Sequence, residues 1–470
     1  MSKPQQNKAK RVVRDTQGIE YELGERIGEG GQGVVFRTQY PGVLLKLSRK
    51  PLTEARVQSW FSHVCWVARQ PLEGLHIASP VALIENKHNP GYVMEVMDGL
   101  EPLSKMLEQS ILAVQEGKGL DEYKSSGGVA RRVRLLARLA RILADLHGRG
   151  LAYGDLSPSN VFVSKSIEHD EVWVIDSDNI SVSSREGGQQ IYSPQFGAPE
   201  ILRGTSGINS LTDSWSFGIL AFQLITLIHP FKGDLVEQES ELEAQALRGE
   251  LPWIDHPEDR RNACSAGRPR EELLTIRLRA LFEQCFNAGL DEPGERPSMA
   301  AWAEGFEAGV ALLAKCDPER GCDSSFLFNP RGQCPFCGND VRASHHVLMR
   351  HAVFAPMAEL GEYATEQDQW IPTHDLQLLH ERRDVELRRS PVGTSTYADS
   401  PVVCRLHLDD AGLHVTPASS LPLFLAKVNG GALIRLSQPF LLKHEWQIGS
   451  TASLHIGDPA SSHAVWRFKW

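Results

Sequence analysis

The chain has 470 residues, of which 41% are hydrophobic and 23% charged, and its net charge is -10. This composition predicts a globular protein of about two to four domains, and the acidic balance argues against a general nucleic-acid binder. The most apolar stretch, residues 217–228, is too short to span a bilayer and contains Gln223 and Thr226, so we expect a buried helix and no membrane segment.

The cysteines indicate a reducing compartment. Four of the eight lie between residues 316 and 337 and the other four are scattered, which favours one metal site over a disulfide framework. No apolar segment of the signal-peptide type follows the N-terminus, so we expect a cytoplasmic protein.

Residues 1–17 are polar and basic, which predicts a disordered tail or an arm that binds nucleic acid or a partner. Residues 18–46 predict strand, glycine turn, strand and strand. Glycines in the turn would let backbone N–H groups approach phosphates without a Cβ in the way. Because β-branched residues follow, a strand continues where a dinucleotide-binding turn would open a helix; a plain glycine-rich hairpin is the alternative. The residues concerned are Gly28, Glu29, Gly30, Gly31, Gly33 and Val35.

A buried strand and a helix come next. Val43 to Lys46 predicts a strand ending in an ammonium group that can reach nucleotide phosphates, although an edge-strand lysine would look the same. The helix predicted over residues 52–69 carries Glu54, a carboxylate that can pair with Lys46 and fix its direction.

An amphipathic helix over residues 129–147 leads into the most informative loop, and we expect its arginines on a solvated face. Asp155 and Asn160 stand five residues apart, and Asp176 follows a short β-branched strand. One carboxylate can accept the proton of an attacking hydroxyl, while the amide and the second carboxylate can hold Mg²⁺. By itself, the first pair also fits a turn aspartate with a capping asparagine.

The next segment is polar and ends in Ala198-Pro199-Glu200. Asp213 to Gly218 then opens the apolar helix, and Arg296 is expected to form a buried ion pair with Glu200. The serines of the polar segment are Ser181, Ser183, Ser184 and Ser193.

With these motifs in this order, residues 18 to about 313 resemble the eukaryotic-type protein kinase domain. The resemblance implies a bilobal fold, with Asp155 as the catalytic base and Lys46 on the phosphates of ATP. It also implies that Asn160 and Asp176 bind Mg²⁺ or Mn²⁺.

The same resemblance makes residues 92–99 the link between the two lobes. Met94 would border the adenine pocket, and the backbone from Glu95 to Met97 would bind the edge of the base. An ordinary strand with methionine as core filler is the alternative.

The sequence departs from this family at three places. Tyr153-Gly154 stands where the family has His-Arg, Ser157 where Ser/Thr kinases have a lysine, and Ser177-Asp178 where the family has Phe-Gly. The loop around Asp155 is also similar to that of aminoglycoside-type phosphotransferases, which act on small molecules. The Ala198-Pro199-Glu200 motif favours a protein kinase, because small-molecule relatives generally lack it.

Four cysteines farther along resemble a zinc ribbon, which implies a closed structural Zn²⁺ site. His345 or His346 could replace the first of them, and a redox pair or plain buried cysteines are the alternatives. The ligands are Cys316, Cys322, Cys334 and Cys337.

Residues 344–383 predict a linker, and residues 384–470 predict short strands with glycine turns. The segments Cys404-Arg405-Leu406-His407, Asn429-Gly430 and Ile448-Gly449 resemble a degraded forkhead-associated (FHA) β-sandwich. Intact members of that family bind phosphothreonine; a purely structural sandwich is the alternative.

The whole sequence therefore predicts an α+β kinase fold followed by a zinc ribbon and an all-β sandwich. We expect a Ser/Thr kinase of bacterial signalling or stress response that acts on protein substrates and resembles kinases with phosphatase and von Willebrand-type partners. A pseudokinase scaffold and a small-molecule kinase are the competing hypotheses. The predicted parts are a tail (1–17), an N-lobe (18–97), a C-lobe (98–313), a ribbon (314–343), a linker (344–383) and a sandwich (384–470).

Overall fold

The computed structural model describes residues 11–29, 33–49, 53–84, 89–183, 192–319, 321–329, 331–340, 346–380, 384–388, 401–426, 432–446 and 449–470. The chain divides into two compact units. The N-terminal unit comprises residues 1–271 and 276–306, and the C-terminal unit comprises residues 272–275 and 307–470.

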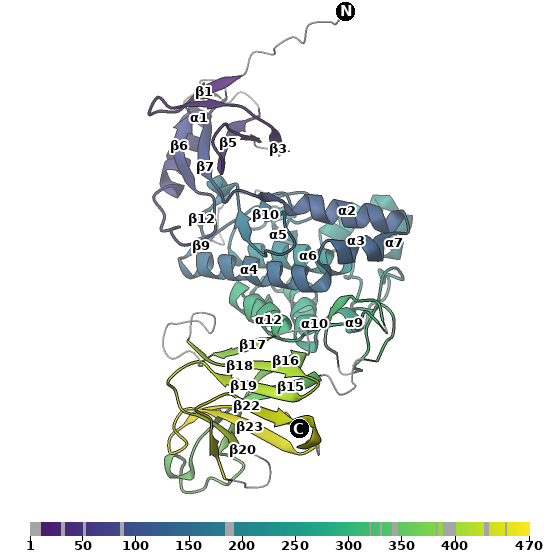
Figure 1. Ribbon diagram of the computed structural model, residues 1–470. Helices are drawn as coiled ribbons and strands as arrows, with labels where there is room; N and C mark the ends of the chain where they lie inside the picture. Colours follow the sequence, from purple (N-terminus) through teal and green to yellow (C-terminus); the bar gives the residue numbers. More distant parts are fainter. Residues whose placement is uncertain are drawn as a thin grey trace, which may run out of the picture. The chain divides into compact units, whose positions relative to one another are not determined.

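An antiparallel sheet of five strands, in the order β3-β4-β5-β7-β6, begins the N-terminal unit (Figure 1). The predicted strand at Lys46 is confirmed as the buried central strand, and the predicted helix as α1, whose Val64 joins the core on this sheet. The elements are β1 (Val12–Arg14), β2 (Glu20–Glu22), β3 (Arg26–Glu29), β4 (Gly33–Arg37), β5 (Val43–Ser48), α1 (Glu54–Val67), β6 (Pro80–Ile84) and β7 (Gly91–Glu95).

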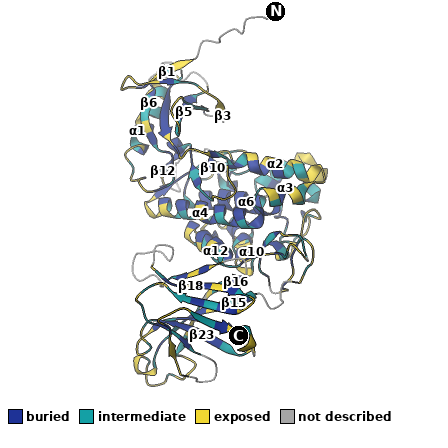
Figure 2. Cartoon of the chain, viewed as in Figure 1, coloured by how far each residue is buried: buried dark blue, intermediate teal, exposed yellow. Residues whose placement is uncertain are grey.

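The rest of the N-terminal unit is mainly helical, with α4 and α6 largely buried (Figure 2). The predicted buried helix around residue 220 is confirmed as α6, which begins at an Asn209 capping box. The helices are α2 (Leu103–Gln115), α3 (Gly119–Ser125), α4 (Gly128–Gly148), α5 (Pro199–Leu202), α6 (Ser210–Thr226), α7 (Asp234–Gln238), α8 (Glu243–Leu247), α9 (Arg270–Leu273), α10 (Ile276–Glu283), α11 (Gly289–Asp291) and α12 (Met299–Ala311).

Two arginines of α4 correct the expectation of a solvated face, whereas Arg138 is exposed as expected. Arg132 is fully buried, where it donates to the Leu224 carbonyl (3.1 Å) and Ser110 Oγ (2.9 Å) and lies over the Tyr123 ring. Arg131 is also buried. Carbonyl and hydroxyl acceptors compensate the cost of burying the charge of Arg132, so this residue can take part in the packing of the helices.

Two small sheets hold the loops between the helices. One has the order β11-β10-β8 and the other pairs β12 with β9. Their strands are β8 (Leu100–Pro102), β9 (Leu151–Ala152), β10 (Val161–Ser164), β11 (Val172–Val174) and β12 (Ser181–Val182). They fix both ends of the loops that carry Asp155 and Asp176.

Two sheets share one hydrophobic core in the C-terminal unit, with Met349, Leu406 and Leu454 fully buried between them. The larger sheet has the order β16-β15-β24-β23-β20-β21 and the smaller β17-β18-β19-β22. The strands are β15 (His346–Phe354), β16 (Trp370–His380), β17 (Val385–Arg388), β18 (Val402–Asp409), β19 (Gly412–Pro417), β20 (Leu423–Ala426), β21 (Ile434–Arg435), β22 (Phe440–Lys443), β23 (Thr451–Ile456) and β24 (His463–Lys469).

The predicted linker at residues 344–383 is wrong. Its sequence contains β15 and β16, the two longest strands of the unit, which pair with each other from Phe354–Trp370 to His346–His380. Their alternation of apolar and polar residues is interrupted by a bulge between Arg350 and Ala352, and this irregularity hides the strand pattern in the sequence.

The predicted ribbon is also not a separate body. Its strands β13 (Leu313–Lys315) and β14 (Ser325–Leu327) pair with each other, and Phe326 packs in one cluster with Leu378 of β16 and Leu348 of β15. The His380 ring contacts the Lys315 carbonyl at 3.0 Å. Ribbon and sandwich therefore form one unit.

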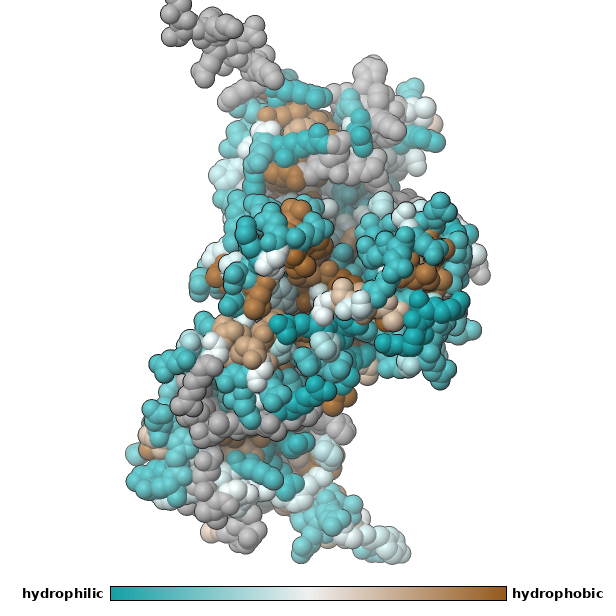
Figure 3. All heavy atoms as spheres, turned by 90° about the vertical axis from the view of Figure 1, so that its right-hand side faces the viewer, coloured by the Kyte–Doolittle hydropathy of each residue, from teal (hydrophilic) through white to brown (hydrophobic). Residues whose placement is uncertain are grey.

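Hydrophilic side chains dominate the face drawn in Figure 3, and hydrophobic ones form separate patches. Among the described residues, no helix is long and apolar enough to cross a membrane.

Candidate active site

The loop that carries Asp155 is held by one buried carboxylate from α6. Asp213 accepts the backbone N–H groups of Tyr153 (2.7 Å) and Gly154 (2.8 Å), and its Oδ2 lies 2.9 Å from His147 Nε2. The Tyr153 ring is fully buried and its hydroxyl donates to the Ile175 carbonyl. These bonds fix the loop before Asp155 on the helical core.

Asp155 and Asn160 lie side by side on this loop. The Asn160 amide donates to the Asp155 carbonyl (2.9 Å), and Ser193 Oγ donates to Asp155 Oδ1 (2.8 Å). Burial raises the pKa of Asp155, and the Ser193 hydrogen bond opposes this rise. The Ser193 hydroxyl thus bonds one oxygen of the carboxylate that is predicted to accept the proton of an attacking hydroxyl.

Asp176 follows β11 and reaches the same place. The Ile175 N–H donates to the Asn160 carbonyl (2.9 Å), which joins the two loops. Asp176 has a φ of 67°, an uncommon conformation for a residue with a side chain and one that often marks functional sites. Burial raises the pKa of Asp176 to about 7. The backbone bond thus brings Asp176 to the loop of Asp155 and Asn160, and the predicted ligands Asn160 and Asp176 carry the oxygen atoms that Mg²⁺ prefers.

Lys46 enters the site from β5. Its ammonium forms ion pairs with Asp176 and with Asp178, the latter at 2.7 Å. Strand β4 passes close to the Lys46 side chain: a Cβ added to Gly33 would lie only 3.0 Å from Lys46 Cε. Burial acts to lower the pKa of Lys46, but the two carboxylates raise it above its ordinary value.

The predicted pairing of Glu54 with Lys46 is not found. Glu54 is the first residue of α1 and is exposed, whereas Trp60 in the middle of that helix faces the site. Lys46 pairs instead with Asp176 and with Asp178, and the sequence presents Asp178 only as a departure from the family motif. The sequence does contain a signal for this pairing, because a second acidic residue stands two positions after Asp176 and both follow a buried strand.

The glycine turn is described only in part. Gly28 and Glu29 lie on β3, where they pair with Val35 and Val34 of β4, and Gly30, Gly31 and Gln32 lie outside the described residues. Val35 is buried in one core cluster with Met94, Leu44 and Phe162. Val35 and Met94 therefore lie in one apolar cluster, and their role beside an adenine ring stays a prediction.

The predicted link between the lobes follows β7. Met94 is fully buried, while Glu95 and Met97 are exposed. The Val96 N–H donates to the Gly42 carbonyl (2.8 Å), so this amide is engaged within the protein. The role of Glu95 and Met97 in binding a base stays a prediction.

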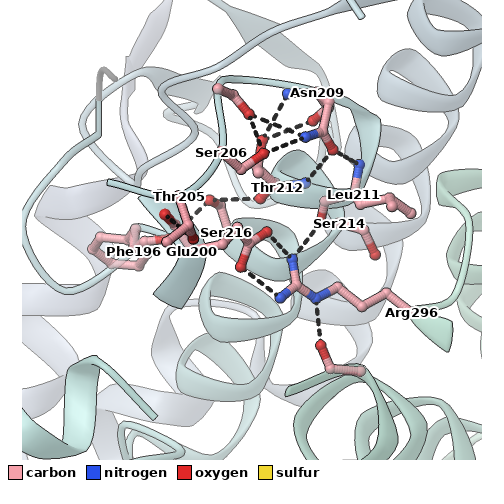
Figure 4. A network of polar contacts seen from close by, with 12 residues as sticks. Phe196, Glu200, Thr205, Ser206, Asn209, Leu211, Thr212, Ser214, Ser216 and Arg296 are labelled. Carbon is pink, nitrogen blue, oxygen red and sulfur yellow. Dashed lines mark hydrogen bonds and ion pairs between the residues drawn. The ribbon is translucent and has the colours of Figure 1, made fainter. Parts of the chain in front are cut away.

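A bidentate ion pair, Glu200–Arg296, joins the start of α5 to the segment before α12 (Figure 4). Arg296 donates to both carboxylate oxygens of Glu200, at 2.7 and 2.8 Å, and to the carbonyl groups of Leu211 and Gly289. The Arg296 side chain is fully buried. The predicted buried pair is confirmed, and its additional acceptors compensate the cost of burying the charge.

The four clustered cysteines converge in the C-terminal unit. Their Sγ atoms lie within 4.8 Å of one another, with Cys316 and Cys337 3.6 Å apart and Cys322 and Cys334 also 3.6 Å apart. Four thiol groups at this spacing fit a tetrahedral Zn²⁺ site. The set needs no histidine ligand; His346 packs instead against Phe328 and His380, and His345 lies outside the described residues.

The segment that resembles an FHA motif lies on a strand. Cys404 is fully buried in the core of the sandwich, Arg405 pairs with Glu386, and His407 pairs with Asp384. Cys404 therefore cannot contact a phosphate without disrupting the core. Asn429, Gly430 and Ile448 lie outside the described residues.

Comparison with known proteins gives one family. Residues 21–303, more than half of the chain, match the family model described as protein kinase domain. Serine/threonine-protein kinase pkn3 of Myxococcus xanthus is 27% identical over 335 residues, which are 68% of this chain and 55% of that protein. Myosin light chain kinase A of Dictyostelium discoideum is 23% identical over 223 residues, 46% of this chain and 70% of that protein. The chain spans only 16% of a further relative, serine/threonine-protein kinase pkn2 of Myxococcus xanthus, at 28% identity.

Proposed function

This chain belongs to the protein kinase family, with serine/threonine kinases among its relatives, and from that premise we propose that it transfers the γ-phosphate of Mg-ATP to serine or threonine residues of protein substrates. The observation that carries the proposal is the convergence of Lys46, Asp155, Asn160 and Asp176 in one site, where Lys46 is buried and the other three residues are partly exposed. A scaffold without catalysis has no chemical need for all four.

Each group has one chemical task in this proposal. Asp155 accepts the proton of the substrate hydroxyl, and the phosphates lie against Lys46. Asn160 and Asp176 would hold Mg²⁺ or Mn²⁺, which neutralises phosphate charge when bound. The fit of the ion rests on the donor set, since the bond from the Ile175 N–H to the Asn160 carbonyl brings a carboxylate and a side-chain amide, both oxygen donors, to neighbouring loops.

A protein substrate is favoured over a small molecule by the helical side of the site. The Glu200–Arg296 pair anchors the Ala198-Pro199-Glu200 segment that begins α5, directly after the chain passes Asp155 at Ser193. Such an anchored segment beside the catalytic base offers a platform for a peptide. The Myxococcus relatives support a place in bacterial signalling or stress response; a phosphatase or von Willebrand-type partner belongs to the same proposal.

The C-terminal unit adds two smaller proposals. The four cysteines bind one structural Zn²⁺, supported by the convergence of their Sγ atoms. The two packed sheets form an FHA-like sandwich of structural character, because Cys404 lies in the core.

The test is transfer of labelled phosphate from Mg-ATP to a panel of proteins encoded near this one. Asp155→Asn should reduce transfer by about 10²–10⁴-fold, the usual contribution of a positioned base. Asp176→Ala should in addition abolish the Mg²⁺-dependent rise in melting temperature that ATP produces, because unneutralised phosphates are repelled by the remaining carboxylates. Labelling of a metabolite with no labelled protein would favour a small-molecule kinase, and no labelling at all a pseudokinase.

A further inference from the structure

We propose that Asp178 is the positioning residue that holds the Lys46 ammonium in the nucleotide site, in place of a carboxylate supplied by α1. The inference rests on the proposed kinase function and specifies how its phosphate-binding lysine is oriented. Neither the motif match nor the relatives assign a role to this residue.

Three donors from three separate elements meet at the Asp178 carboxylate. Lys46 Nζ of β5 lies 2.7 Å from Oδ1, and the Tyr92 hydroxyl of β7 donates to the same oxygen at 3.2 Å. The Trp60 indole of α1 donates to Oδ2 at 3.1 Å. The side chain of Asp178 is only 1% exposed and that of Lys46 only 5%, so this geometry is enforced by packing.

Helix α1 has no carboxylate to offer at this place. Its sequence contains a single acidic residue, Glu54, at its first and exposed position. The residue that reaches Asp178 from the middle of the helix is Trp60, a hydrogen-bond donor that cannot neutralise an ammonium group. A buried ammonium needs a charged partner, and Asp178 supplies it from the other side of the site.

The segment that carries Asp178 is itself fixed. Ser177 Oγ donates to the Ala78 carbonyl (2.7 Å), and the Ile180 N–H closes a tight turn on the Ser177 carbonyl (3.0 Å). Asp176 and Asp178 therefore lie on one short turn, and the Trp60 bond helps to hold the Asp178 carboxylate in place against Lys46.

The arrangement also protects the proposed metal ligand. Lys46 contacts both Asp176 and Asp178. Without the charge of Asp178, the ammonium would have Asp176 as its remaining carboxylate in this cluster and would compete with a divalent cation for it. Loss of Asp178 should consequently weaken the binding of the phosphates and leave the binding of the base unchanged.

The experiment compares ATP and adenosine binding by calorimetry in Mg²⁺ for the full chain and for Asp178→Asn. We expect ATP affinity to fall by more than about tenfold and adenosine affinity to change by less than about twofold. The matched control is Asp15→Asn, which neutralises another buried carboxylate of the same unit that also accepts a tyrosine hydroxyl, from Tyr21 at 3.0 Å. This control should leave the ratio of the two affinities unchanged.

A double-mutant cycle with Lys46→Met identifies the route of the effect. If Asp178 acts through Lys46, Asp178→Asn should cost ATP affinity less than about twofold once the lysine is gone. Equal losses for ATP and adenosine, or fully additive losses in the cycle, would overturn the proposal. So would a larger selective loss of ATP affinity in Glu54→Gln than in Asp178→Asn.

Trp60→Phe provides a milder variant if Asp178→Asn does not fold, because it removes one hydrogen bond and keeps an aromatic ring. It should lower ATP affinity in the same selective way, by about two- to fivefold; an equal effect on adenosine would contradict the proposal. Both binding measurements are independent of phosphoryl transfer. A wild-type chain that binds ATP as expected but transfers no phosphate would refute the proposed function and leave this inference standing.

Discussion

Gly154 shows how one backbone position restricts what the active-site loop can carry. Its φ is 93°, and a Cβ would lie 2.7 Å from Ile208 Cδ1. In the family that the sequence resembles, an arginine at this place pairs with a phosphate on the activation segment. In this chain the activation segment is the polar stretch between Asp176 and Ala198. Here the loop has neither the side chain nor room for one.

Replacing Gly154 with alanine should destabilise the protein by about 1–3 kcal/mol, because the substitution combines an unfavourable φ with a close contact. The matched control is Gly148→Ala, at the end of α4, where a Cβ would meet nothing within 4 Å and no left-handed φ is required. Urea unfolding of both variants measures the difference. Equal stability of the two variants would show that the loop relaxes freely.

His229 is the residue whose ionisation should matter most for the helical core. Burial lowers its pKa to about 4, and both ring nitrogens are bonded: Nε2 to the Gln195 carbonyl (3.0 Å) and Nδ1 to the Phe231 N–H (3.2 Å). Because the folded state binds the proton more weakly than the unfolded state, stability is complete above the ordinary pKa of about 6.5. It is lost progressively as the pH falls towards 4.

At about pH 5 this loss should reach about 2 kcal/mol. Glutamine cannot take up this proton. Between neutral pH and about pH 5, the free energy of unfolding of His229→Gln should therefore fall by about 2 kcal/mol less than that of the wild type. Urea unfolding at about pH 7.5 and about pH 5, followed by far-ultraviolet circular dichroism, reports on the helices, which belong mainly to the N-terminal unit. Parallel pH dependences of wild type and variant would contradict the neutral state of His229.

At the scale of elements, the activation segment after Asp176 is held by contacts of its own. Ser181 pairs with Ala152 in the β12–β9 ladder, and Ser183 Oγ accepts the Ser210 N–H (3.1 Å). Farther on, Ser193 donates to Asp155, while residues 184–191 lie outside the described part of the chain. Phosphate groups are not needed to form these contacts.

Phosphatase treatment should therefore change the specific activity by less than about tenfold, roughly 1.4 kcal/mol of transition-state stabilisation. Combined replacement of Ser181, Ser183 and Ser184 by alanine should have an equally small effect. Ser193→Ala must be measured separately, because it removes a hydrogen bond to the proposed base and not only a modification site. A larger loss of activity in phosphatase-treated wild-type protein would refute the prediction.

At the scale of the whole chain, we expect the stability of the C-terminal unit to depend on zinc bound at its cysteine cluster. Strands β13 and β14 pair over only three residues each, yet their Phe326 covers Leu348 and Leu378 of the large sheet. So short a hairpin cannot fold on its own without a cross-link or metal. Zinc should therefore stabilise one face of the sandwich as well as the ribbon.

The full chain purified without chelator should contain one zinc per chain by elemental analysis. Removing it, or changing Cys334 to Ser, should lower the melting temperature of the C-terminal unit by at least about 5 °C. Cys65→Ser, at a partly buried cysteine in α1 outside the cluster, is the control. Protein that carries no zinc, or a chelator without effect on melting, would exclude the structural site.

What the sequence determined by itself was local in the chain. The spacing of Asp155, Asn160 and Asp176, the apolar period of α4 and α6 and the cysteine pattern each depend on neighbouring residues, because secondary structure and metal-ligand spacing are set within a few turns of backbone. The Glu200–Arg296 pair is the exception, because its members lie 96 residues apart and were nevertheless predicted, from their opposite charges and their places in the motifs.

Only the tertiary structure decided which distant groups meet. Lys46 and Asp178 are 132 residues apart, and their contact arises because α1 presents Trp60 to the site and leaves Glu54 in solvent. In the same way, Arg132 is buried because carbonyl groups of other elements compensate it. Desolvation and compensation of charge depend on everything packed around a group, so the pattern of one segment does not contain them.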